Sequence, residues 1–116
     1  MNKNNSLLSF CIPTFTDDIR KGNLRTLVDS ILKNFGNDIN FEIIICDDSL
    51  EINTEIQELQ KRYCNLRYIK NEIRNGLVFN YIDSLSMSQS IYVMPLSDED
   101  EINIQTKKSL LPILKR

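Results

Sequence analysis

The stretch FEIIICDDSL, residues 41–50, decides the fold class because a nearly unbroken apolar run ends in two adjacent carboxylates. The run is rich in isoleucine, and it lacks the polar alternation of a strand with one face in water. Strands of this kind lie inside sheets that carry helices on both faces. The stretch therefore predicts a central strand of an α/β protein.

The sequence on either side of this strand alternates between strand and helix patterns. Strands are predicted at 7–13, 41–48, 66–70 and 91–96, the last of them buried and bent at Pro95. Helices are predicted at 24–35, 52–63, 77–85 and 104–116. Asn23 is the expected cap of the first helix and Gly36 its end, whereas Pro112 kinks or ends the last. This order favours a mainly parallel sheet with helices on both faces, in one domain spanning 1–116.

The composition narrows the class of protein. The 116 residues are 41% hydrophobic and 26% charged, as in ordinary globular domains, and the net charge of −2 without a basic stripe argues against nucleic-acid binding. The absence of histidine excludes histidine-based catalysis and most zinc sites. No signal peptide and no membrane span is recognisable, so a cytoplasmic location is expected, with Cys11 and Cys46 as buried reduced thiols.

Carboxylates follow two of the predicted strands. Asp47 and Asp48 end the strand at 41–48, and the run Asp98-Glu99-Asp100-Glu101 follows the strand at 91–96. Parallel strands bring their carboxyl ends to one edge of a sheet, which is where ligands bind in α/β folds. Clustered carboxylates repel one another unless a cation lies between them, and Mg²⁺ or Mn²⁺ with a diphosphate would meet that need. Two simpler interpretations stay open: a solvated helix cap for the acidic run, and a turn at Asp48.

Four segments, taken in this order, resemble family 2 of the glycosyltransferases, which have the GT-A fold. They are LLSFCIPTF, LRTLVDSIL, FEIIICDDSL and NGLVFNYIDSLSMSQSIYVMPLSDEDEI. The resemblance covers residues 7 to about 114. It implies a Rossmann-like nucleotide-binding half, with the acceptor-binding half and its catalytic base absent. It also implies transfer of a sugar from a nucleotide-diphosphate sugar to an acceptor hydroxyl, in cell-surface polysaccharide or glycoconjugate synthesis.

The resemblance also implies site residues. The nucleotide-sugar-binding positions would be Thr14, Phe15, Asp48, Arg74, Gly76, Asn80 and Asp98. Mn²⁺ or Mg²⁺ would be bound by the Asp-x-Asp pattern of Asp98, Glu99 and Asp100, in a register that stays open. Phe15 stands where the family usually has tyrosine, and Arg74 where it usually has asparagine. Simpler roles are a turn glycine for Gly76 and an exposed helix position for Asn80.

Other functions compete with this one. A truncated, non-catalytic nucleotide-binding or interaction module has the same sequence features. A receiver domain or an Asp-x-Asp phosphatase would need acids after the first strand, where this chain has Pro13-Thr14-Phe15. The expected partners are a nucleotide-sugar donor and an unidentified acceptor glycan or lipid-linked glycan. Peripheral membrane association of a full-length protein and self-association through exposed apolar surface are further expectations.

Overall fold

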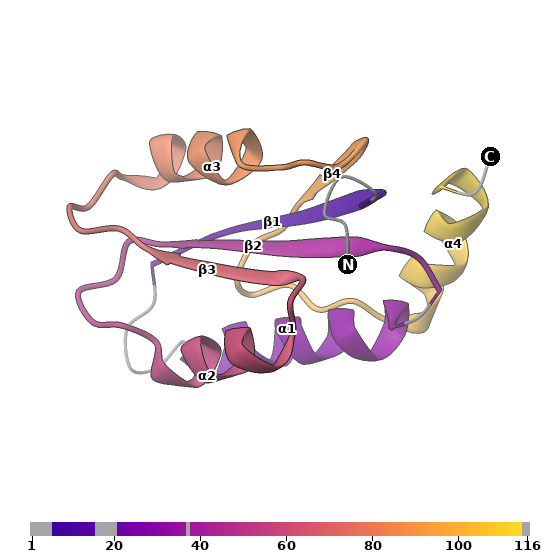
Figure 1. Cartoon of the computed structure of the whole chain (residues 1–116), viewed down its shortest axis with the longest axis horizontal. Coiled ribbons are helices and arrows are strands. Elements are labelled where there is room, and N and C mark those ends of the chain that lie inside the picture. The colour runs from indigo at the N-terminus through magenta and orange to yellow at the C-terminus, as the bar shows by residue number, and fades with distance from the viewer. Residues whose placement is uncertain (1–5, 16–20, 37, 115–116) are drawn as a thin grey trace.

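Strands and helices alternate in the computed structural model, which describes residues 6–15, 21–36 and 38–114 (Figure 1). The strands are β1 (Leu8–Thr14), β2 (Phe41–Asp47), β3 (Leu66–Lys70) and β4 (Tyr92–Pro95). The helices are α1 (Lys21–Phe35), α2 (Thr54–Arg62), α3 (Leu77–Ser86) and α4 (Ile104–Leu114). Every predicted element is present, although residues 115–116 of the last predicted helix lie outside the described residues. The predicted α/β class is confirmed.

The four strands form one parallel sheet in the order β3-β2-β1-β4. The two inner strands, β1 and β2, pair from Leu8 opposite Phe41 to Thr14 opposite Asp47 and are buried along their full length. Since all strands run the same way, β1, β2 and β4 bring their carboxyl ends to one rim of the sheet. We call this edge the carboxyl rim.

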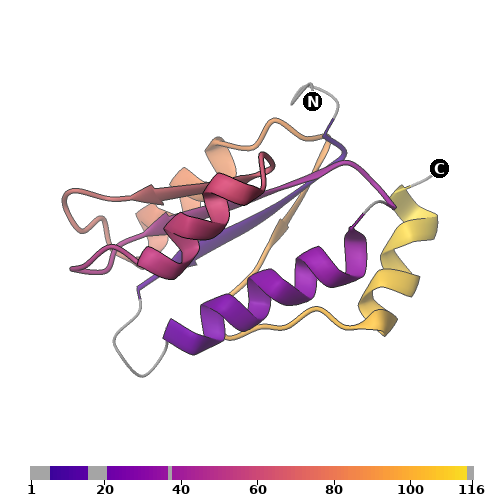
Figure 2. The ribbon, with the colours of Figure 1, turned by 60° about the horizontal axis from the view of Figure 1, so that its bottom comes forward.

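Helices cover both faces of the sheet, as Figures 1 and 2 show: α3 lies on one face, and α1 and α2 lie on the other with α4 beside α1. The larger core fills the α1 and α2 side, where Phe10, Ile12 and Ile45 of the sheet meet Leu27 and Ile31. A smaller core on the α3 side contains Cys11, Ile44 and Cys46, so the predicted burial of both cysteines is confirmed. As far as the chain is described, none of the helices has the length and apolar content that a membrane span requires.

Four local predictions need correction or refinement. Asn23 is not the cap of α1, because the helix already includes Lys21. β4 is not buried: it pairs with β1 alone among the described strands, and Tyr92 and Val93 are 43% and 47% exposed. Pro95 is the last residue of β4, and α4 runs through Pro112 to Leu114. The expected end of α1 is confirmed, since Gly36 follows the helix with a positive φ of 26°.

Candidate functional site

Thr14, the last residue of β1, connects the two acidic strand ends. Its hydroxyl donates a hydrogen bond of 2.6 Å to Oδ2 of Asp98, and its carbonyl accepts one of 2.8 Å from the backbone N–H of Asp48. All three residues are buried. Asp48 and Asp98 therefore share the carboxyl rim, with the end of β1 between them, as the sequence predicts.

Asp48 holds the loop that leads from β3 to α3. Its Oδ1 accepts hydrogen bonds from the backbone N–H of Asn75 at 3.0 Å and the amide of Asn71 at 2.6 Å. Its Oδ2 accepts a further bond of 2.9 Å from the N–H of Gly76. Both carboxylate oxygens thus bind the 71–76 loop. In this conformation Asp48 positions that loop, which is a role the sequence did not reveal.

Gly76 and Asn80 begin α3 at the same rim. Gly76 is the N-cap residue with φ 85° and ψ 159°, a backbone region that is nearly restricted to glycine. Asn80 is only 2% exposed; its Nδ2 donates to the carbonyl of Cys46 at 2.8 Å and its Oδ1 accepts from Asn71 at 2.9 Å. The interpretation of Asn80 as an exposed helix residue is therefore wrong. The positive φ at this position is sufficient to explain why a glycine is found there.

Phe15 and Arg74 come from separate segments and meet at the carboxyl rim. The guanidinium carbon of Arg74 lies 4.1 Å from the centroid of the Phe15 ring, which is the geometry of a cation–π contact. The Phe15 side chain is 41% exposed and Arg74 is exposed as well. The contact places an aromatic surface and a cation beside the acidic strand ends.

The acidic run divides into a buried and an exposed part. Asp98 is 3% exposed, whereas Glu99 and Asp100 are exposed in the turn that follows. Oδ2 of Asp100 accepts a 2.8 Å bond from the N–H of Ser97, which closes this turn. Within residues 6–15, 21–36 and 38–114, no three carboxylate, thiol or imidazole groups lie together as a metal site. Glu99 and Asp100 are exposed residues with carboxylate groups, and Mg²⁺ and Mn²⁺ take one or two such ligands together with phosphate and water.

Sequence reasoning missed two residues that support this rim, Asn71 and Tyr68, and it did not predict the contacts of Asp47. Asn71 joins Asp48 to Asn80, and only its place directly after β3 could have indicated it. Asp47 is fully buried and accepts hydrogen bonds from the Tyr68 hydroxyl and the N–H of Ser49. Burial, and then the hydrogen bond to Asp47, raise the pKa of the Tyr68 phenol, so Tyr68 stays a neutral donor.

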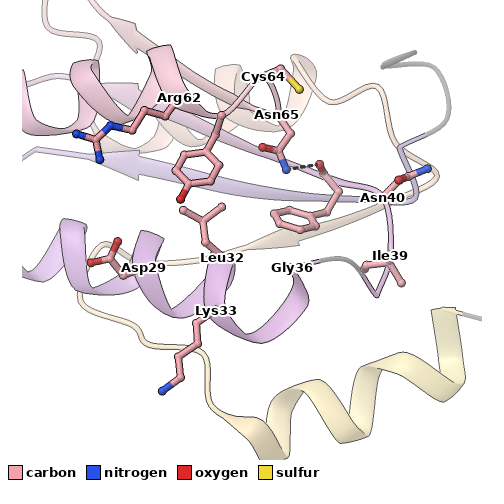
Figure 3. Close-up of a pocket in the computed structure, with 11 residues that line it drawn as sticks. Asp29, Leu32, Lys33, Gly36, Ile39, Asn40, Arg62, Cys64 and Asn65 are labelled. Carbon is pink, nitrogen blue, oxygen red and sulfur yellow. Dashed lines mark hydrogen bonds between the residues drawn. The ribbon is translucent and has the colours of Figure 1, made fainter.

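A cavity of about 740 Å³ lies elsewhere, between the C-terminal ends of α1 and α2 (Figure 3). Leu32, Gly36, Phe41 and Asn65 are among the residues that line it. Phe41 begins β2 and Asn65 directly precedes β3, so the cavity lies at the amino ends of these strands. It contains none of the predicted site residues and is separate from the carboxyl rim.

Comparisons with known proteins agree with this arrangement. The profile of Glycosyl transferase family 2 matches residues 9–116. A search of curated protein sequences finds no match. The crystal structure of S. aureus TarS 1–349 superposes with a TM-score of 0.77 at 22% identity, over 94% of this chain and 32% of TarS 1–349.

Two ligand complexes of the same protein are equally similar in fold. TarS 1–349 with UDP gives a TM-score of 0.77, and the complex with UDP-GlcNAc gives 0.76, both at 22% identity and over 94% of this chain. They are covered over 32% and 31% of their own length, so this chain spans about a third of TarS 1–349. The similarity in structure confirms the GT-A fold, and the match over 9–116 shows that the chain belongs to glycosyl transferase family 2.

Proposed function

We propose that this domain binds a nucleotide-diphosphate sugar at the carboxyl rim, as the donor for transfer of the sugar to an acceptor hydroxyl. The observation that carries the proposal is the Thr14 connection: Thr14 ends β1 and binds both Asp48, after β2, and Asp98, after β4, the two strands that flank β1. Ligands of open α/β sheets bind at such an edge. The family match over residues 9–116 supports the reaction class.

Each side of the rim has a distinct part in this proposal. Phe15 offers a surface on which a base stacks, and Arg74 offers a cation for phosphate. The 71–76 loop, held by Asp48, forms the wall at the start of α3. Asp98 anchors the acidic run through Thr14, so that Glu99 and Asp100 face outward.

A divalent cation fits the outer part of the acidic run. Asp100, with Glu99 beside it, would hold Mn²⁺ or Mg²⁺ against the diphosphate of the donor. When bound, the ion would neutralise the charge that develops on the leaving diphosphate. Asp98 contributes by fixing the start of the turn, because its carboxylate is buried against Thr14. In this proposal the metal ligands of the Asp-x-Asp pattern are therefore Glu99 and Asp100, and Asp98 is a positioning residue.

A non-catalytic nucleotide-binding module is the second candidate. It needs only the nucleotide-binding positions at the carboxyl rim, which a transferase would use as well. Both candidates bind nucleotide, so binding alone does not separate them. A transfer assay with a UDP-sugar and a panel of acceptor glycans does: turnover supports the transferase, whereas binding without turnover supports the module. The proposed place of the transferase is cell-surface polysaccharide or glycoconjugate synthesis.

Calorimetry with UDP and Mn²⁺ tests the proposal, UDP being chosen because TarS 1–349 was crystallised with it. We expect UDP to bind in the presence of Mn²⁺ and to raise the melting temperature, because a ligand of the folded state stabilises it. D100N keeps the acceptor for Ser97 but lowers the charge, and it should weaken Mn²⁺-dependent binding about tenfold or more. The matched control E58Q removes an exposed carboxylate of α2 and should bind like the wild type. Failure of UDP and the other nucleoside diphosphates to bind would contradict the proposal.

A further inference from the structure

The guanidinium of Arg74 occupies a surface that a nucleotide base would need. Its central carbon lies 4.1 Å from the centroid of the Phe15 ring, over one face of the ring. A planar base stacks on an aromatic ring at a comparable distance. A base and the Arg74 guanidinium therefore compete for this face of Phe15.

The backbones on both sides of this contact are fixed, whereas the Arg74 head group is exposed. Phe15 directly follows Thr14, which is held by Asp98, and the N–H groups of Asn75 and Gly76 are held by Asp48. Arg74 itself is exposed and its side chain has several rotatable bonds. The guanidinium can leave Phe15 without movement of the loop backbone.

A diphosphate is a stronger partner for this guanidinium than the ring. An exposed cation–π contact is weak, while arginine binds phosphate oxygens through two charge-assisted hydrogen bonds. The carboxylates of Asp98, Glu99 and Asp100 make the rim acidic, so a bound diphosphate needs a nearby cation. Arg74 is in the loop that borders this rim.

We propose that Arg74 determines specificity by covering Phe15 until a diphosphate draws its guanidinium away. The site then favours nucleoside diphosphates over nucleosides, because only a ligand with phosphates uncovers the surface on which its own base stacks. Binding of phosphate and binding of the base are thereby coupled: bound phosphate raises the affinity for the base, and a bound base raises the affinity for phosphate by the same factor. This inference rests on the proposed binding of nucleotides at the carboxyl rim.

Titration of the wild type and R74A with uridine, pyrophosphate and UDP, in the presence of Mg²⁺ and followed by NMR, tests the coupling. Removal of an exposed cation–π contact should make uridine bind about 2–5-fold tighter to R74A than to the wild type. UDP should bind more weakly to R74A, because the phosphate partner is lost. Saturating pyrophosphate should strengthen uridine binding to the wild type about 2–5-fold and leave R74A unchanged.

Two further variants exclude simpler explanations. R62A removes an exposed arginine at the end of α2 and should leave all three affinities unchanged. In the background of F15L, which lacks the ring, R74A should no longer improve uridine binding. If R74A leaves uridine affinity unchanged or weakens it as much as UDP, the coupling is disproved while nucleotide binding stands. If the wild type binds no UDP, the proposed function fails and the coupling with it.

Discussion

The hydroxyl of Thr14 donates a 2.6 Å hydrogen bond to the carboxylate of Asp98, which lies 84 residues further along the chain. This bond joins the end of β1 to the turn after β4, and the carbonyl of the same threonine binds the N–H of Asp48 at the end of β2. Three segments of the candidate site are thus held together by one residue. Its removal should affect both stability and the position of the acidic run.

Replacement of Thr14 by valine should lower the free energy of unfolding by about 1–3 kcal/mol, because the buried Asp98 carboxylate loses a donor. T14S keeps the hydroxyl and should stay closer to the wild type. Urea unfolding of the three proteins measures the difference. A T14V protein as stable as T14S would show that the bond contributes nothing to stability.

Asp48→Asn should loosen the 71–76 loop, because the amide cannot accept at both positions that bind the N–H groups of Asn75 and Gly76. We expect hydrogen exchange at these two amides to accelerate about tenfold, equivalent to about 1.4 kcal/mol. D29N changes an exposed carboxylate of α1 and serves as the control. Unchanged protection at both amides in D48N would contradict the positioning role.

Gly36 and Gly76 have a positive φ among the described residues, and substitutions at these two positions should have different outcomes. At Gly76, φ 85° and ψ 159° are unfavourable for any side chain, so G76A and G76N should both lower the free energy of unfolding by about 1–3 kcal/mol. An added Cβ meets nothing within 4 Å, so the effect comes from the backbone alone. At Gly36, which follows α1, asparagine should be tolerated better than alanine.

Thermal unfolding of the four glycine variants measures this contrast. If G76N proves as stable as the wild type, the 71–76 loop has another backbone conformation. Equal destabilisation by G36N and G36A would indicate that the conformation after α1 is not left-handed.

The three cysteines should react at very different rates. Burial, with a smaller contribution from Glu42, raises the pKa of Cys11 to about 12, and burial, followed by Asp83, raises that of Cys46 to about 11. Both thiols therefore stay protonated and inaccessible near pH 8, whereas Cys64 is exposed. A thiol reagent should modify one cysteine in the native protein and three in denaturant, and C64S should abolish the native reaction. Fast native labelling of C64S would contradict the burial of the other two.

The fold follows from sequence patterns that depend on burial. The isoleucines of β2 and the three- and four-residue spacing in α1 report which side chains face the core, so element order and the parallel sheet could be predicted. The exposure of β4 could not be predicted from the sequence, because an apolar strand at a sheet edge can have the same composition as a buried strand. The start of α1 before Asn23 was missed since capping residues also occur within helices.

The location of the candidate site could be predicted from the sequence, but the hydrogen-bond partners of its residues could not. The acidic ends of β2 and β4 point to one rim whenever the strands are parallel, and Thr14 connects them there. The partner of a buried polar atom cannot be read from spacing. The carboxylate of Asp48 therefore binds the 71–76 loop, and Asn80 binds the carbonyl of Cys46, without a sequence signal for either contact.

An NMR titration of the ¹⁵N-labelled protein with UDP and Mg²⁺ tests most directly where nucleotide binds. Binding at the carboxyl rim predicts shift changes at Thr14, at Phe15, in the 71–76 loop and at residues 98–100. The amides of Cys64 and Asn65, at the cavity on the other end of the strands, should stay unchanged. Shift changes confined to that cavity, or none at saturating UDP and Mg²⁺, would contradict a donor site at the carboxyl rim.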